Sequence, residues 1–153
     1  MLNYTNAITE EKSYSGLQMK EFKPVMKLII RGKKREFLSA IGKSLNLLLP
    51  TEANTSSRSE KLTALWLSPD EWMVHSNETI NSESNEYETE NLLNKNISKT
   101  NLGAVTNVTD QFVLINIKGD KIFDLFETGS PFNFNDFRYK KGSVTQTILA
   151  KID

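Results

Sequence analysis

Residues 65–74 read LWLSPDEWMV, and this stretch decides how the chain is expected to fold. An apolar run stands on each side of a polar centre, which predicts two strands at residues 62–67 and 72–75. Pro69 suits the second position of a tight turn because its ring fixes φ, and Asp70 is readily accommodated after it. The stretch therefore predicts a β-hairpin with Ser-Pro-Asp-Glu at its corner.

The segments around this hairpin alternate between strand and helix patterns. A β-branched run at residues 25–32 predicts a strand, and Phe37, Ile41 and Leu45 then fall four residues apart on a helix that Pro50 ends. A second, weaker helix is expected at residues 87–99, with Leu92, Leu93 and Ile97 on its apolar face. Further elements are expected at residues 104–108 and 112–119 (strands paired across 109–111), 120–129 (helix, with Ile122, Leu125 and Phe126 inward) and 144–152 (strand).

The order β-α-β-β-α-β matches a split βαβ, ferredoxin-like sandwich of the α+β class, with helices on one face of a mostly antiparallel sheet. Residues 1–22 are polar and aperiodic, so we expect a flexible polar tail there. Residues 23–153 are expected to form a single α+β domain.

Composition limits the classes of function. The 153 residues are 38% hydrophobic and 25% charged with zero net charge, which favours a globular protein and argues against nucleic-acid or membrane-surface binding. The absence of cysteine excludes disulfides, thiolate metal sites and cysteine nucleophiles. No secretory pattern and no apolar run of about 20 residues is visible, so a cytoplasmic location is expected.

The candidate site residues carry little catalytic signal. Asp70 and Glu71 are neighbours in a turn, whereas catalytic carboxylates converge on a substrate from different elements, so a solvated hairpin corner is the preferred interpretation. Trp66 and Trp72 are interpreted as core or interface aromatics. His75 is the only histidine. A flavin can be attached to histidine in some oxidases, but a histidine without function at a strand end is the preferred interpretation. Phosphate-binding glycine motifs and metal-ligand spacings are absent, so no catalytic or metal residue is assigned.

Several motifs resemble the sarcosine oxidase gamma subunit family. LWLSPDEWMV is similar to that family's Leu-Gly-Pro-Asp-Glu-Trp motif between two strands, and GSVTQTILA is similar to its final Thr-Gln-Thr strand. Four other stretches, MKLIIRG, LNLLLPTEANTSS, AVTNVTDQFVLINIKG and FETGSPFNF, agree in order and spacing, so the resemblance runs from about residue 26 to residue 150. The sequence departs from the family at Ser68, where glycine is usual, and at Ser130, where cysteine is common.

The resemblance implies a fold like the folate-binding domain of the glycine-cleavage aminomethyltransferases. Family members continue past the Thr-Gln-Thr strand, so the C-terminal strand and helix of that fold are expected to be missing here. The implied function is that of a non-catalytic accessory subunit of a heterotetrameric, flavin-dependent sarcosine oxidase, which demethylates sarcosine to glycine in one-carbon metabolism. The alpha, beta and delta subunits are the implied partners, and FAD, FMN, NAD, zinc and tetrahydrofolate are expected on them and not on this chain.

The sequence leaves two alternative functions open beside the accessory-subunit interpretation, and each interpretation has its own candidate contact residues. In the accessory-subunit interpretation, Trp66 and Trp72 are the candidate anchors on a larger partner. A free-standing folate-binding module is the first alternative, with Asp70, Glu71, Gln146 and Thr147 as candidate pterin contacts. An RNA-binding protein ranks last, because residues 112–119 and 144–150 offer few aromatic residues on a basic sheet and the net charge is zero.

Overall fold

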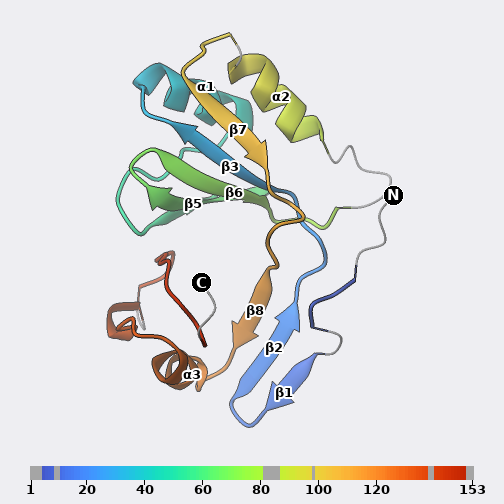
Figure 1. Ribbon diagram of the computed structural model, residues 1–153, viewed down its shortest axis with the longest axis vertical. Helices are drawn as coiled ribbons and strands as arrows, with labels where there is room; N and C mark the ends of the chain where they lie inside the picture. The colour runs from blue at the N-terminus through green and yellow to red at the C-terminus, as the bar shows by residue number, and fades with distance from the viewer. Residues whose placement is uncertain (1–4, 9–10, 81–86, 98, 138–139, 151–153) are drawn as a thin grey trace. The chain divides into compact units, whose positions relative to one another are not determined.

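The computed structural model describes residues 5–8, 11–80, 87–97, 99–137 and 140–150. The chain divides into two compact units, which Figure 1 shows with their elements labelled. The central unit comprises residues 25–112, and the terminal unit comprises residues 1–24 and 113–153. This division differs from the expected single domain over residues 23–153, because residues on both sides of the central unit join in one further sheet.

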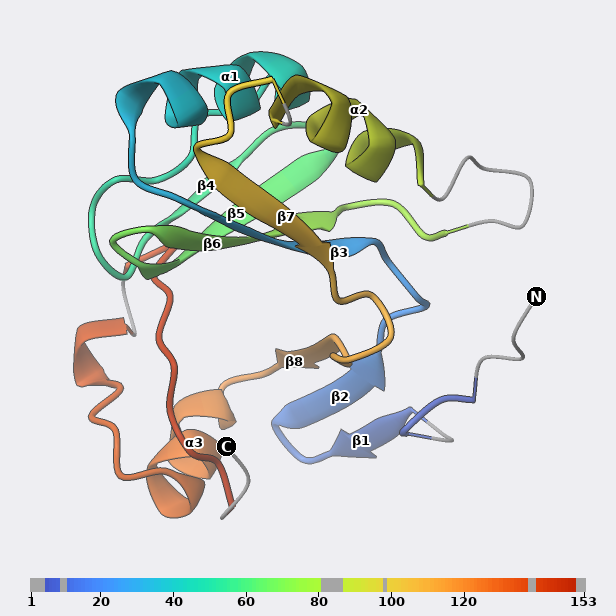
Figure 2. The same ribbon diagram turned by 45° about the horizontal axis from the view of Figure 1, so that its top comes forward.

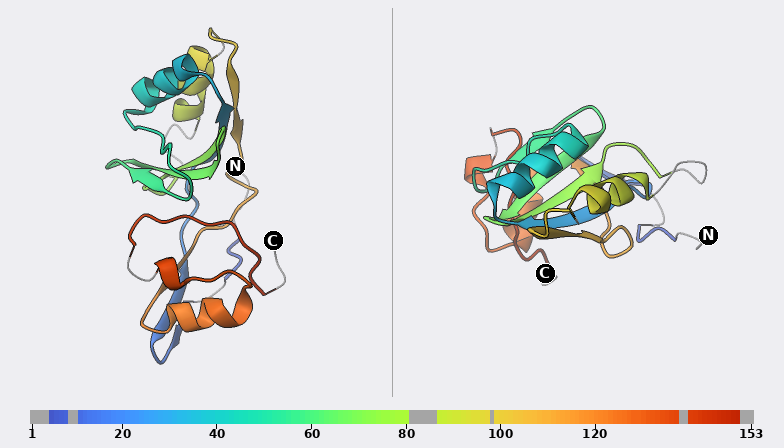
Figure 3. Two further views of the ribbon diagram at one scale, coloured as in Figure 1. Left: turned by 90° about the vertical axis from the view of Figure 1, so that its left-hand side faces the viewer. Right: turned by 90° about the horizontal axis from the view of Figure 1, so that it is seen from above.

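The central unit has the predicted ferredoxin-like architecture. Its five-stranded antiparallel sheet has the order β4-β5-β6-β3-β7, and without the short edge strand β4 this is the strand order of a split βαβ sandwich. Both helices cover the same face of the sheet and lie side by side (Figures 2 and 3). The elements are β3 (Lys27–Gly32), α1 (Arg35–Leu45), β4 (Ser56–Arg58), β5 (Leu62–Ser68), β6 (Glu71–Ser76), α2 (Glu88–Ile97) and β7 (Gly103–Asn107).

The core of the central unit lies between the sheet and its two helices. Alternate residues of the strands face the helices, so Leu28 and Ile30 of β3 lie beside Val74 of β6, and all three are fully buried. Helix α1 contributes Phe37 and Ile41, also fully buried, as the four-residue spacing predicted. Burial of each such side chain stabilises the fold by about 1.5–3 kcal/mol, which makes this layer the main source of stability.

Both helices differ in detail from the prediction. Helix α1 ends at Leu45 and not at Pro50, because Asn46 adopts the left-handed conformation (φ 49°) that terminates helices. In α2, Leu93 and Ile97 are buried as expected, whereas Leu92 is 43% exposed. The narrow apolar face of α2 is therefore made by two of the three predicted residues.

The hairpin formed by β5 and β6 has the predicted two-residue turn. Ser68 pairs with Glu71, which leaves Pro69 and Asp70 as the turn residues. Proline cannot adopt the positive φ of the turns that match strand twist, so the hairpin needs another source of twist. A β-bulge between Trp66 and Ser68 supplies it.

The terminal unit contains a three-stranded antiparallel sheet in the order β1-β2-β8, followed by helices. Its elements are β1 (Lys12–Tyr14), β2 (Leu17–Glu21), β8 (Ile115–Lys118), α3 (Ile122–Gly129) and a 3-10 helix (Asn135–Phe137). Residues 12–21 are therefore a hairpin and not part of a flexible tail. Its turn contains Gly16, whose φ of 77° favours glycine, and the Gly16 carbonyl accepts a hydrogen bond from the Lys121 backbone amide at 3.1 Å.

Two strand predictions are wrong. Strand β7 pairs with β3, and β8 pairs with β2, so these consecutive strands lie in different sheets and do not form a hairpin across residues 109–111. Residues 144–148 run as an extended segment that belongs to no strand (Figure 2), and the last residues of the predicted strand, 151 and 152, lie outside the described residues. Helix α3 forms as predicted, but its apolar residues Ile122, Leu125 and Phe126 are only half-buried.

None of the helices in the described ranges has the length and apolar character needed to cross a bilayer.

Candidate functional site

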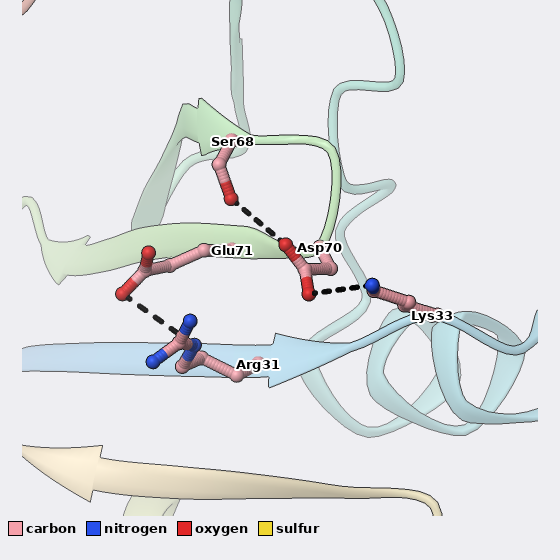
Figure 4. A network of polar contacts seen from close by, with 5 residues as sticks. All are labelled: Arg31, Lys33, Ser68, Asp70 and Glu71. Atoms are coloured by element: carbon pink, nitrogen blue, oxygen red, sulfur yellow. Dashed lines mark hydrogen bonds and ion pairs between the residues drawn. The ribbon is translucent and has the colours of Figure 1, made fainter.

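Asp70 joins the hairpin corner to the end of β3 and to the connection that precedes α1 (Figure 4). Its backbone carbonyl accepts a hydrogen bond from the Gly32 amide at 3.0 Å. Its side chain accepts a hydrogen bond from the Ser68 hydroxyl at 3.0 Å and lies 3.5 Å from the Lys33 ammonium. The Asp70 carboxylate is thus engaged on both oxygens by groups of its own unit.

Glu71 is held by a different cation. Its carboxylate lies 3.8 Å from Nε of Arg31, the residue opposite it on β3 (Figure 4). The side chains of Arg31 and Lys33 are 63% and 79% exposed, so each ion pair contributes only about 0–1 kcal/mol. Asp70 and Glu71 each contact a separate cation, which agrees with a structural corner and not with a catalytic carboxylate pair.

The environment of Asp70 favours its charged form. The hydrogen bond from Ser68 lowers the pKa of the Asp70 carboxyl below its ordinary value of 3.8, and the positive charge of Lys33 acts in the same direction. A general acid at neutral pH needs the opposite shift. Asp70 is therefore ionised at neutral pH and unsuited to donate a proton.

The two tryptophans lie on the helix-covered face of the sheet. Trp72 is 2% exposed, and its indole Nε1 donates a hydrogen bond to the Pro50 carbonyl oxygen at 2.7 Å. Trp66 lies directly opposite Trp72 on β5, is half-buried and packs against the core. Trp72 has no surface to offer a partner, so its first role is in the fold of this chain, and a contact with a partner stays a prediction for Trp66.

His75 lies on the other face of the same strand. It is opposite Thr63 on β5 and opposite Lys27 on β3, and its Nδ1 lies 2.9 Å from the carbonyl oxygen of Ser76. Among the described residues, no group of three or more His, Cys, Asp and Glu side chains is placed to hold a metal ion. Within the described ranges, no carboxylate is placed in hydrogen-bond contact with the His75 ring.

Lys27 is a charged residue whose burial the sequence pattern did not indicate. It is 5% exposed, and its ammonium donates a hydrogen bond to the Val25 carbonyl oxygen at 3.1 Å. Burial lowers the pKa of Lys27 below 10.5, and the negative charge of Asp110 partly opposes this shift. A lysine within an apolar run gives no sign of such burial, because the alternation of the strand places it on the face away from the core.

The four candidate pterin contacts are divided between the two units. Asp70 and Glu71 lie at the hairpin corner of the central unit, whereas Gln146 and Thr147 lie in the extended segment of the terminal unit. The Thr147 hydroxyl lies 2.9 Å from that of Ser130, the residue that stands where the family commonly has cysteine. Ser130 thus has a polar contact that needs no sulfur.

Each unit also contains a pocket. The pocket of the central unit has a volume of about 480 Å³, lies between α2 and the end of β7, and is lined by Tyr87, Glu90, Asn91, Asn107, Thr109, Asp110 and Gln111. Glu90 accepts a hydrogen bond from the Asn107 side-chain amide at 2.7 Å. Of the two carboxylates that line this pocket, Glu90 and Asp110, the first is therefore already engaged. The pocket of the terminal unit is of similar size, about 460 Å³, and is mainly apolar.

Comparison with known proteins identifies a solved structure with a similar fold and a matching protein family. The fold is similar to a chain of the heterotetrameric sarcosine oxidase from Corynebacterium sp. U-96 in complex with pyrrole 2-carboxylate, with a TM-score of 0.76. The match covers 89% of this chain and 67% of that chain at 16% sequence identity, and it shows a shared fold. A search of curated proteins finds no match. The profile of the sarcosine oxidase, gamma subunit family matches residues 32–153, which is most of the sequence, and the chain belongs to this family.

Proposed function

We propose that this chain is a non-catalytic accessory subunit that assembles with the larger subunits of a heterotetrameric, flavin-dependent sarcosine oxidase. The observation that carries the proposal is the family match over residues 32–153. The shared fold with a chain of a heterotetrameric sarcosine oxidase supports it. The alpha, beta and delta subunits are the proposed partners, and the flavins, NAD, zinc and tetrahydrofolate are proposed to bind to them.

The contacts of the candidate residues support a non-catalytic role. Asp70 is ionised and held by Ser68 and Lys33, and Glu71 is paired with Arg31. A general base needs a free lone pair directed at a substrate, and a general acid needs a raised pKa. Each carboxylate is instead paired with a cation of its own unit, and the pKa of Asp70 is lowered and not raised.

The test is co-expression of the alpha, beta and delta subunits with and without this chain carrying an affinity tag. Gel filtration is read at the protein and flavin absorption bands, and sarcosine-dependent oxygen consumption is measured on the purified complex. The expected result is co-elution of the chain with the flavin. A chain that elutes alone and without flavin contradicts the proposal.

A set of variants tests the non-catalytic part separately. Asp70→Asn and Glu71→Gln each remove the charge of a carboxylate at the hairpin corner. His75→Gln removes the imidazole on the same strand as Glu71. Complexes assembled with each variant are expected to keep the turnover per flavin of the wild-type complex. Loss of turnover in a fully assembled complex would show that this chain takes part in the chemistry.

A further inference from the structure

Strand β7 is the least protected edge of the two sheets in the described part of the chain. These sheets end in four edge strands, β1, β8, β4 and β7. Strands β1, β4 and β8 have three or four residues, and they contain Lys12, Arg58 and Lys118, respectively. Short length and basic side chains are common means of preventing pairing at a sheet edge. Strand β7 (Figure 1) has five residues and contains neither a charged residue nor a proline, so it lacks these protections.

The ladder between β7 and β3 leaves one row of backbone groups directed away from the sheet. The Val108 amide donates a hydrogen bond to the Lys27 carbonyl oxygen at 2.9 Å, which fixes the alternation of this antiparallel ladder. Every second residue of β7 therefore has its N–H and C=O groups directed outward. These residues are Gly103, Val105 and Asn107. Their backbone groups accept and donate no hydrogen bond within the described ranges, and their spacing matches the backbone of one more extended strand.

A pocket with acidic walls lies at one end of this edge. It is the pocket of about 480 Å³ in the central unit, and Asn107, the last residue of β7, lines it together with Glu90 and Asp110. No lysine or arginine is among its described lining residues, and the adjoining residues 76–94 contain five glutamates and neither lysine nor arginine. The Lys27 ammonium interacts electrostatically with Asp110 but is buried and does not line the pocket. The pocket therefore complements a cationic side chain.

A second copy of this chain does not supply that side chain. Its own β7 offers only glycine, alanine, valine, threonine and asparagine. Lys99 is the nearest cation before the strand, but Asn101 lies between them in the left-handed conformation (φ 50°), which ends the extended chain. Pairing of two β7 strands would thus leave both pockets without a cation. These features favour a strand from a different polypeptide.

We propose that an extended segment of another sarcosine oxidase subunit adds to the free edge of β7 and continues the central sheet. The segment forms backbone hydrogen bonds with Gly103, Val105 and Asn107. It directs a lysine or arginine side chain into the pocket lined by Glu90 and Asp110. The inference rests on the proposed function, because it names the edge through which the accessory subunit binds.

The experiment measures the affinity of the purified chain for the complex of the remaining subunits, prepared without this chain. Val105→Pro removes an outward N–H and places a ring where the added strand would lie, while the hydrogen bonds to β3 remain because Val105 makes none of them. Asp110→Lys reverses a charge of the pocket at an exposed residue. Each is expected to weaken binding about tenfold or more. The effect of Asp110→Lys is expected to shrink at high salt, where charge interactions are screened.

Two matched variants control for unspecific effects. Val105→Ala shortens the same side chain but keeps its N–H, and Glu60→Lys makes a charge change of the same size at an exposed loop residue that does not line the pocket. Both are expected to bind within about twofold of the wild type, because exposed charges away from the contact have small effects and the edge hydrogen bonds are kept. Far-UV circular dichroism and thermal unfolding establish that each variant is folded.

Hydrogen exchange tests the same edge in the wild-type chain and decides the outcome if Val105→Pro does not fold. The amides of Gly103, Val105 and Asn107 are directed outward in the free chain, so they are expected to exchange more slowly in the complex. Mass spectrometry of a peptide that covers residues 99–108, from the free chain and from the complex, measures this change.

Four outcomes would overturn the inference in whole or in part. If the wild-type chain binds but residues 103–107 exchange as in the free chain, or folded Val105→Pro binds equally well, β7 is not the docking edge, whereas the proposed function stands. If Asp110→Lys binds as tightly as the wild type, no cationic side chain enters the pocket. If the chain alone sediments as a dimer that Val105→Pro dissociates, the occupant is a second copy of this chain. If the wild-type chain does not bind the remaining subunits, the proposed function fails and the inference fails with it.

Discussion

Replacement of Trp72 by alanine tests whether this residue belongs to the core of the chain or to a contact with a partner. The ring is 2% exposed and its Nε1 donates a hydrogen bond to the Pro50 carbonyl oxygen. Removing a buried tryptophan side chain typically costs about 3–5 kcal/mol through lost burial and the cavity left behind. Leaving the Pro50 oxygen without its donor costs about 1–3 kcal/mol more if that oxygen stays buried.

The expected loss for Trp72→Ala is therefore about 4–8 kcal/mol, a large part of the 5–15 kcal/mol of a typical domain. Trp72→Phe keeps most of the apolar area but loses the donor, so a smaller loss of about 2–3 kcal/mol is expected. Trp66→Ala is the matched control, since Trp66 lies opposite on the neighbouring strand but is only half-buried. Its expected cost is about 1–2 kcal/mol.

The assay is urea denaturation of the isolated chain, followed by far-UV circular dichroism, which does not depend on the removed fluorophore. The predicted order of stability is wild type, Trp66→Ala, Trp72→Phe, Trp72→Ala. Equal stability of Trp72→Ala and Trp66→Ala would refute the assignment of Trp72 to the core. A loss of assembly in Trp72→Ala is expected as a consequence of unfolding, so it cannot by itself identify an interface.

Three further predictions follow from single contacts. Burial lowers the pKa of Lys27, so the charged lysine destabilises the folded state below that pKa, and stability rises as the pH increases towards 10.5. Lys27→Met should stabilise the chain by about 1 kcal/mol at neutral pH and flatten this rise of stability with pH, as thermal unfolding at several pH values would reveal. Ser68→Ala should raise the pKa of Asp70 towards 3.8, as NMR titration would show. Because the pKa of Asp70 is lowered in the folded state, the stability that its charged form contributes above pH 3.8 is lost on acidification, and the variant should lose less stability than the wild type over the same pH range. Gly103→Ala should cost about 1–3 kcal/mol in urea denaturation, since the added Cβ would overlap the Arg31 carbonyl oxygen and the Phe37 ring, and an unchanged midpoint would contradict this packing.

The central unit could be predicted from sequence because its local signals agree with its tertiary packing. The four-residue spacing in α1 and the Pro69–Asp70 turn each specify one local structure, and together they leave the split βαβ order as the natural arrangement. The error at β7 and β8 has a physical cause. Consecutive strands usually pair, but β7 instead completes the free edge of β3 over five residue pairs.

The terminal unit was harder to predict because its sheet joins residues distant in sequence. The turn at Ser15–Gly16 with strand residues on both sides is a hairpin signal that could have been found at residues 12–21. Its pairing with β8, about a hundred residues later, has no local signal. The same holds for the burial of Lys27 and for the pocket of the terminal unit, which both depend on packing between elements.

The most direct test of the account is sedimentation velocity of this chain mixed with the alpha, beta and delta subunits, recorded at the protein and flavin absorption bands. The account predicts that the chain joins the flavin-containing boundary and that this boundary sediments faster than without it. Sarcosine turnover per flavin in the joined complex should be unchanged by Asp70→Asn or Glu71→Gln. A chain that remains in a separate, flavin-free boundary at saturating concentrations would contradict membership in the complex.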